Sequence, residues 1–232
     1  MRNIIKNLMP TPPYKKGFTL AEVLITLVII GVIAAITIPS LINKTRNQEY
    51  VSKLKKAYST LAQATKLIVA EEGMPRADKG GWATSGENLY LLYKKHLLKS
   101  RDCEGNVGCF EQGGYVGLNG TDQSNFNVAA SEKYNFRKLV LSDGVQIRFD
   151  GISTDCSTSR TGSSNFCAWM HVDINGAKKP NTYGRDLFEF IIKENGGLYP
   201  VGCDNEETDK CDREHSGRAC ACKVIREDAM NY

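Results

Sequence analysis

The chain has 232 residues, with 30 Lys and Arg against 26 Asp and Glu, so its formal net charge is +4. Four of the basic residues lie within the first sixteen positions, and without them the two signs balance at 26 each. This balance gives no indication of nucleic-acid binding by bulk charge.

The N-terminal region divides into a basic leader and an apolar run. The leader, residues 1–17, contains no acidic residue, and Glu22 is the only ionisable side chain in residues 18–42. About 20 apolar residues cross the hydrocarbon core of a membrane, so we expect residues 18–42 to form a transmembrane helix. Because basic residues stay on the cytoplasmic side, the chain after Asn43 is expected outside.

The junction between leader and helix resembles that of type IV pilins and type II secretion pseudopilins. The match is Gly17-Phe18-Thr19-Leu20-Ala21-Glu22-Val23-Leu24-Ile25, with Gly31 and Pro39 further along. The resemblance implies that a prepilin peptidase cuts after Gly17 and that the new N-terminus, Phe18, is methylated. It also implies partners: copies of this chain or other pilin-like subunits, inner-membrane assembly machinery, and membrane lipid.

Glu22 needs a partner if its helix enters lipid, because an ionised acid there costs about 2.5–3.5 kcal/mol even on lenient scales. One candidate is the ammonium that cleavage creates on Phe18 of a neighbouring subunit, which would give Glu22 a role in assembly. The other is local: Thr19 and Glu22 have the spacing of a capping box, in which the acid bonds the Thr19 N–H. Both roles can operate in turn.

Residues 43–72 show the period of an amphipathic helix that continues from the apolar run. Apolar and small residues recur at steps of three and four: Val51, Leu54, Tyr58, Leu61, Thr65 and Ile68. Gly73 and Pro75 end the pattern. We therefore expect one helix from about Thr19 to Glu72, whose second half lays this stripe on a head domain formed by residues 73–232.

The head is expected to be α+β, with an antiparallel sheet packed on the long N-terminal helix and with disulfide-stapled loops. Residues 87–98 read as a short helix, and residues 103–120 as a glycine-rich loop. Strands are expected at 138–141, 145–149, 165–174 and 186–192, separated by turn residues. One face of the sheet should cover the helix and the other should meet solvent.

All eight cysteines come after residue 100, and an even number in an exported domain indicates disulfides. Local candidates are Cys103–Cys109 and Cys156–Cys167. A C-terminal cluster contains Cys203, Cys211, Cys220 and Cys222, in which Cys220 and Cys222 should bond different partners. Zinc is the alternative for this cluster and His215, although the spacings match no common zinc finger.

Asp173, Asn175 and Asp186 form a candidate calcium site, because carboxylate and amide oxygens suit a hard cation. The alternative, which we favour, is a hairpin turn in which Asp and Asn bond their own backbone. No other cofactor is indicated. The three histidines, His96, His171 and His215, lie in no catalytic motif, so an enzyme is not expected.

These features predict a structural subunit of the bacterial inner membrane with a head in the periplasm or another extracytoplasmic space. After cleavage at Gly17, helix packing would assemble it into a type IV pilus or a type II secretion pseudopilus. The alternative is a membrane-anchored binding or adhesion domain that does not polymerise.

Overall fold

A computed structural model of the chain describes residues 17–104, 114–123, 136–160, 163–176, 178–203 and 210–232. The chain divides into two compact units, Met1–Lys44 and Thr45–Tyr232, and each is described by itself.

In the first unit, the first part of helix α1 (Leu20–Glu72) carries the apolar run. It is long and apolar enough to cross a membrane by length and composition, and none of its most apolar window is buried by protein. Pro39 lies inside the helix, which continues through it. The expected continuous helix is therefore present.

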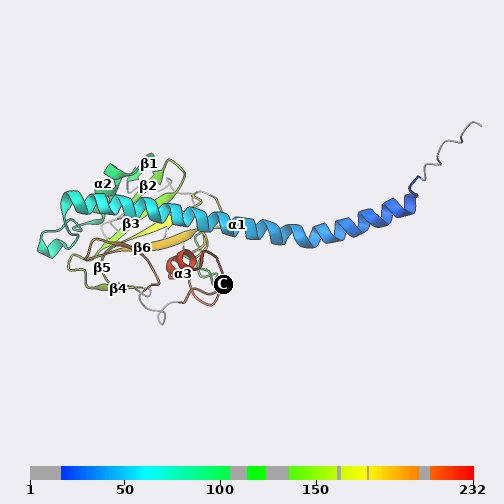
Figure 1. The fold of residues 1–232 in the computed structure, drawn as a ribbon. Coiled ribbons are helices and arrows are strands. Elements are labelled where there is room, and N and C mark those ends of the chain that lie inside the picture. Colours follow the sequence, from blue (N-terminus) through cyan, green and yellow to red (C-terminus); the bar gives the residue numbers. More distant parts are fainter. Residues whose placement is uncertain (1–16, 105–113, 124–135, 161–162, 177, 204–209) are drawn as a thin grey trace, which may run out of the picture. The chain divides into compact units, whose positions relative to one another are not determined.

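In the second unit, the rest of α1 packs on a sheet (Figure 1). Its buried residues include five of the six residues of the expected stripe, and Tyr58 is partly buried against the same core. The helix ends at Glu72 because Gly73 adopts a left-handed φ of 84°. The Gly73 N–H then bonds the Val69 carbonyl at 3.0 Å, which satisfies one of the last carbonyls of the helix.

The sheet has seven strands, and all of the pairings between them are antiparallel. Their order is β1-β2-β3-β5-β6-β7, with β4 paired to β5. The bounds are Lys99–Glu104 for β1, Arg137–Leu141 for β2, Gln146–Ile152 for β3, Thr158–Arg160 for β4, Ser163–Asp173 for β5, Leu187–Lys193 for β6 and Leu198–Pro200 for β7. The expected hairpin and the two later strands are confirmed as β2, β3, β5 and β6.

Helix α2 (Gly86–His96) lies on the α1 side of the sheet and shares its core. It begins at Ser85, whose side chain accepts a hydrogen bond from the Asn88 N–H at 3.0 Å. Tyr93 packs on Phe149 of β3 with ring centroids 5.3 Å apart. A short 3-10 helix, η1 (Ala77–Lys79), precedes α2, and helix α3 (Cys220–Glu227) follows the sheet.

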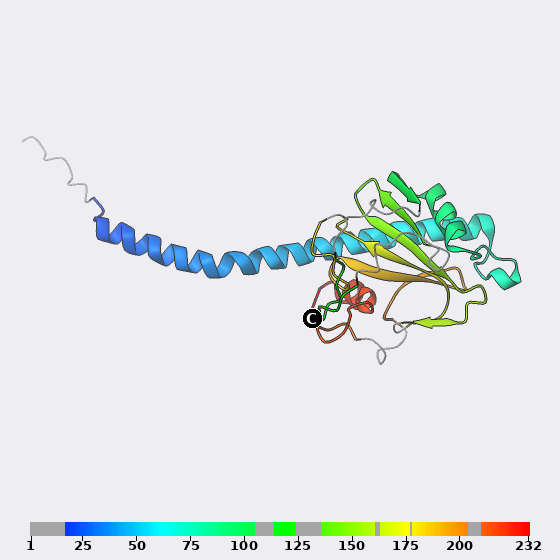
Figure 2. The same ribbon diagram turned by 180° about the vertical axis from the view of Figure 1, so that it is seen from behind.

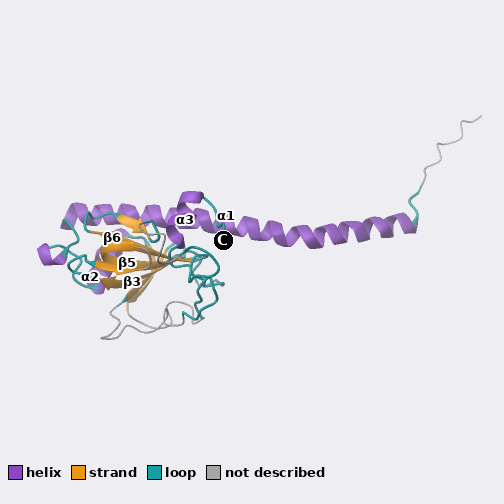
Figure 3. Cartoon of the chain, turned by 90° about the horizontal axis from the view of Figure 1, so that it is seen from below, coloured by secondary structure: helices purple, strands orange, loops and turns teal. Residues whose placement is uncertain are grey.

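The opposite face of the sheet does not meet solvent over its centre, and this expectation was wrong. Lys138, His171 and Glu189 point to that face and are at most 1 % exposed. Figure 2 shows this face with α1 behind the strands, and in Figure 3 loops lie beside the strands on the side away from α1. Tyr115 and Tyr183, from two such loops, pack there on Leu187 in a small second core. The head is therefore a sheet covered on both faces, by helices on one and by loops on the other.

Candidate assembly segment and sites in the head

The junction at Gly17 and Phe18 is open. Both residues precede the helix and are exposed, Phe18 by 89 %. A Cβ placed on Gly17 would meet nothing within 4 Å. The fold itself thus places no steric demand for glycine at this position, so a requirement for glycine would come from a processing enzyme.

Thr19 and Glu22 form the expected capping box at the start of α1. The Glu22 carboxylate accepts hydrogen bonds from the Thr19 N–H and hydroxyl, both at 2.8 Å. In return, the Glu22 N–H donates to the Thr19 hydroxyl oxygen at 3.2 Å. This arrangement satisfies donors that the first turn of any helix leaves open.

The apolar side chains that follow form a continuous exposed surface. Large hydrophobic residues between Leu20 and Ile42 are 45 % to 78 % exposed: Leu20, Val23, Leu24, Ile25, Leu27, Val28, Ile29, Ile30, Val32, Ile33, Ile36, Ile38, Leu41 and Ile42. Soluble proteins rarely expose apolar patches beyond a few hundred Å². This segment therefore needs lipid or other helices around it.

Three disulfides join described cysteines: Cys156–Cys167, Cys203–Cys222 and Cys211–Cys220. The first is a pair expected from the sequence, and the other two give Cys220 and Cys222 different partners. Because the four cysteines of the C-terminal cluster are all in disulfides, they supply no thiolate for zinc. Cys103 is also disulfide-bonded, and its expected partner Cys109 lies outside the described residues.

The candidate calcium residues come together at the end of β5. The Asn175 amide nitrogen donates to Asp186 Oδ2 at 2.9 Å, and Asp173 Oδ1 accepts the N–H groups of Asn175 and Gly176 at 3.1 and 2.9 Å. Asp186 also accepts the Asn181 and Thr182 N–H groups at 2.8 and 2.5 Å. This bonding is that of a hydrogen-bonded turn.

The same cluster also has features that suit a cation. Asp173 and Asp186 are fully buried, and burial raises the pKa of each carboxyl, that of Asp173 further through repulsion by Asp186. The Oδ1 atoms of Asn175 and Asn181 are buried, and neither accepts a hydrogen bond from the described residues. Two acids and two amide oxygens fit a hard cation, although no group of three His, Cys, Asp or Glu that could hold a metal occurs in the described part of the chain.

A row of charged side chains crosses the loop-covered face of the sheet, and the sequence analysis missed it. Lys138, Arg148, His171 and Glu189 face one another on β2, β3, β5 and β6 in direct cross-strand register. His171 Nε2 lies 2.7 Å from Glu189 Oε1, its Nδ1 contacts Asp150, and Arg218 bonds Glu189 at 3.2 Å. Each ring nitrogen of His171 therefore lies against a carboxylate.

The electrostatics of this row follow from burial and neighbouring charge. Burial would raise the pKa of Asp150, but His171 and Arg148 outweigh it and hold that pKa below its usual range. Burial, helped by Arg148, lowers the pKa of Lys138 to about 8. The alternation of charged residues along the strands was the only sequence signal for this row, and such alternation fits an exposed face equally well.

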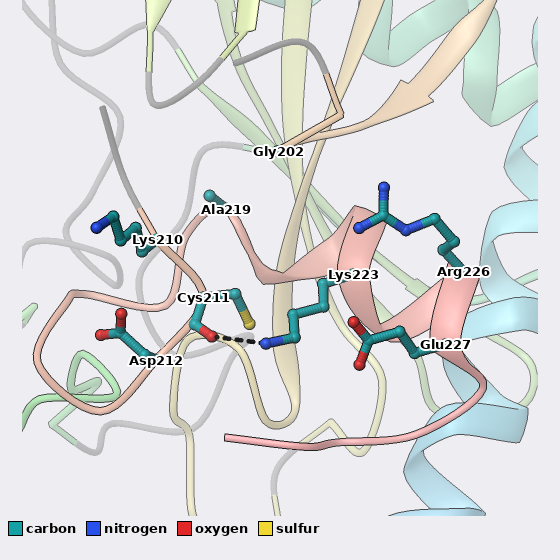
Figure 4. Close-up of a pocket in the computed structure, with 8 residues that line it drawn as sticks. All are labelled: Gly202, Lys210, Cys211, Asp212, Ala219, Lys223, Arg226 and Glu227. Carbon is teal, nitrogen blue, oxygen red and sulfur yellow. Dashed lines mark hydrogen bonds between the residues drawn. The ribbon is translucent and has the colours of Figure 1, made fainter. Parts of the chain in front are cut away.

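A cavity of about 340 Å³ lies between α3 and the loop around Cys211 (Figure 4). Its charged lining is mixed, with Lys210, Lys223 and Arg226 against Asp212 and Glu227. The Lys223 ammonium donates to the Cys211 carbonyl at 3.5 Å. This cavity offers room for a small ligand.

Comparison with known families supports the N-terminal interpretation. Residues 12–38 match the prokaryotic N-terminal methylation motif, which is the signature of type IV pilins and pseudopilins. The match contains the junction at Gly17 and Phe18, the capping box and most of the exposed apolar helix. A comparison with curated proteins and one with solved structures found no match.

Proposed function

We propose that this chain is a prepilin-type structural subunit that is cut after Gly17, methylated at Phe18 and assembled into a type IV pilus or a type II secretion pseudopilus. The observation that carries the proposal is the methylation motif at residues 12–38, at the start of a helix whose large apolar side chains between Leu20 and Ile42 are exposed. Prepilin peptidase processing and packing between pilin-like subunits follow in general from that motif.

The proposed chemistry of assembly centres on Glu22. Cleavage gives Phe18 a free ammonium, and a carboxylate and an ammonium that leave water together must pair. In a bundle of such helices, the Phe18 ammonium of one subunit meets Glu22 of the next. Only one axial stagger brings these groups together, so the pair would also fix the register. Until then, Thr19 satisfies the carboxylate locally.

The exposed apolar surface supplies the second part of the mechanism. In lipid, apolar side chains gain little by packing on one another, so helix association there depends on close packing and polar contacts. Glu22 provides such a polar contact near the start of the helix. We thus assign specificity to Glu22 and the bulk of the contact area to the apolar side chains.

Mass spectrometry of the protein from membranes and from sheared filaments tests the proposal. The expected result is a chain that begins with N-methylated Phe18 in both fractions. A chain that retains residues 1–17 contradicts processing. A processed chain that never enters the sheared fraction contradicts assembly and favours the second candidate, a membrane-anchored binding domain, for which the cavity in Figure 4 offers a place to bind a ligand.

Calcium binding at Asp173, Asn175 and Asp186 is a separate proposal. It is supported by the two buried carboxylates and by the buried amide oxygens of Asn175 and Asn181. The hydrogen bonds already made within the cluster favour the turn alone. If calcium binds, these residues would hold it through oxygen atoms and it would brace the loop between β5 and β6.

A further inference from the structure

Three exposed basic side chains belong to the second unit of the chain. They are Arg46 on α1 and Lys178 and Lys179 in the loop between β5 and β6. The pKa of Glu49 is lowered, first by Lys53 and then also by Lys178 and Arg46, so Lys178 and Arg46 both act electrostatically on one carboxylate. That carboxylate is already paired with Lys53 at 2.8 Å. Among the described residues, Arg46, Lys178 and Lys179 form no ion pair of their own.

The β5–β6 loop is tied to α1 at a defined point. The Asn175 amide donates to the Tyr50 hydroxyl at 3.2 Å, and both residues lie within the second unit of the chain. Lys178 and Lys179 follow Asn175 by three and four residues. The two lysines are therefore held near the turn of α1 that contains Tyr50.

The length of chain between this patch and the apolar run is short. Arg46 follows Ile42, the last residue of the run, by four positions, and Tyr50 follows it by eight. Along a helix these separations are about 6 Å and about 12 Å. The headgroup layer on each side of a bilayer is about 5–8 Å thick. When residues 18–42 span a membrane, Arg46 and Tyr50 are thus separated from the apolar run by a length of chain comparable to the headgroup layer.

We propose that Arg46, Lys178 and Lys179 form a docking surface for the headgroups of anionic phospholipids, which holds the head at the membrane before assembly. This inference rests on the membrane anchoring in the proposed function. Its chemical basis is complementarity between cations that form no described ion pair and a negatively charged surface, an attraction that falls off within a Debye length. The short chain between the apolar run and Arg46 keeps the patch within reach of lipid in every anchored molecule, whereas contact with a second copy arises only in a filament.

Lysine acetylation of the whole mature chain in lipid nanodiscs tests the proposal. We expect Lys178 and Lys179 to react about fivefold more slowly in discs that contain phosphatidylglycerol than in discs of phosphatidylcholine alone. High salt should remove the difference. Lys66 is a matched internal control, because it is an exposed lysine on α1 that lies about 30 Å of helix beyond Arg46. Its acetylation rate should be the same in both discs.

Two variants sharpen this test. Arg46→Gln should reduce the lipid-dependent protection of Lys178 and Lys179, while Lys66→Gln should leave it unchanged. Equal acetylation rates in the two kinds of disc would overturn the proposal. So would protection that appears only in assembled filaments, because it would assign the patch to a second copy of the chain. A chain that fails to enter nanodiscs at all would instead refute the membrane anchoring on which the inference rests.

Discussion

Thr19 and Glu22 satisfy each other at the start of α1: the carboxylate accepts two hydrogen bonds from Thr19 and the Glu22 N–H returns one. The acid is therefore bonded in a single chain, before any neighbouring subunit is present. This finding separates two roles that Glu22 could have, because glutamine keeps a capping box and removes the charge.

Substitution of Glu22 tests those roles directly. If Glu22 pairs with the Phe18 ammonium of a neighbour, Glu22→Gln and Glu22→Ala should both be inserted and cleaved but sharply reduced in sheared filaments. The physical reason is that only the carboxylate can neutralise the ammonium. The measurement is the amount of subunit in the sheared fraction relative to the membrane fraction. Normal assembly of Glu22→Gln with loss in Glu22→Ala would leave capping as the role.

Gly17→Leu should leave the leader attached if, as we propose, the chain is cut after Gly17 and the peptidase recognises this glycine. The fold has open space at Gly17, so folding of the head should not change. Intact mass of the membrane protein measures the result. A Gly17→Leu chain at the mature mass would show that the junction is elsewhere.

Alkylation under denaturing conditions without reductant should find at least six of the eight cysteines blocked. Peptide mapping should recover Cys156–Cys167, Cys203–Cys222 and Cys211–Cys220. The reduced protein, in which all eight should react, is the control. Six or more reactive thiols without reductant would refute the disulfide framework.

The pH dependence of stability should carry the signature of the buried Asp173. Its pKa is raised well above 3.8 by burial and by Asp186. Between 3.8, the pKa in the unfolded chain, and the raised pKa in the folded protein, the folded state binds more protons than the unfolded state. The free energy of unfolding therefore falls as pH rises through that window. Asp173→Asn should remove this loss, so the stability of the variant should rise relative to that of the wild type from acid to neutral pH.

Thermal melting at a series of pH values measures that difference. Asp155→Asn is the control, because Asp155 is exposed and its pKa is lowered, chiefly by the Ser157 hydroxyl. A lowered pKa makes the wild type more stable as pH rises, and Asp155→Asn removes this gain. The stability of the control should therefore fall relative to that of the wild type as pH rises. A difference between the wild type and Asp173→Asn that does not change with pH would contradict the assignment.

The calcium proposal predicts that calcium stabilises the head, by about 2.7 kcal/mol at a hundredfold excess over the dissociation constant. Melting in millimolar calcium and in chelator provides the comparison, and Asp173→Ala should remove any rise. Identical melting curves for the wild type in both conditions would leave only the hydrogen-bonded turn.

Much of the fold could be predicted from periodicity alone. The steps of three and four from Val51 to Ile68 indicated the face of α1 that is buried, and turn residues around Asp143 indicated the hairpin of β2 and β3. Strands β1 and β7 were missed, because Lys99–Glu104 is mostly charged and Leu198–Pro200 is only three residues long. Helix α3 was missed because it has only eight residues, and its two cysteines indicated disulfides rather than a helical period.

The buried charged row could not be found in the same way. Alternating polar residues such as Arg148 and Glu189 predict an exposed strand face unless something covers it. The cover comes from Tyr115, Tyr183 and Arg218, which are distant in sequence and lie in loops without a repeating pattern. In contrast, the N-terminal segment was predictable because its chemistry is local: cleavage junction, cap and apolar helix are contiguous.

The two disulfides of the C-terminal helix have a consequence for where the protein can mature. Cys220 and Cys222 are two residues apart, so they leave α3 about 200° apart around its axis, and their bonds hold the helix from opposite sides. Neither bond persists in a reducing cytoplasm. A chain whose head stays in a reducing compartment therefore lacks both cross-links on α3, and their formation requires an oxidising compartment.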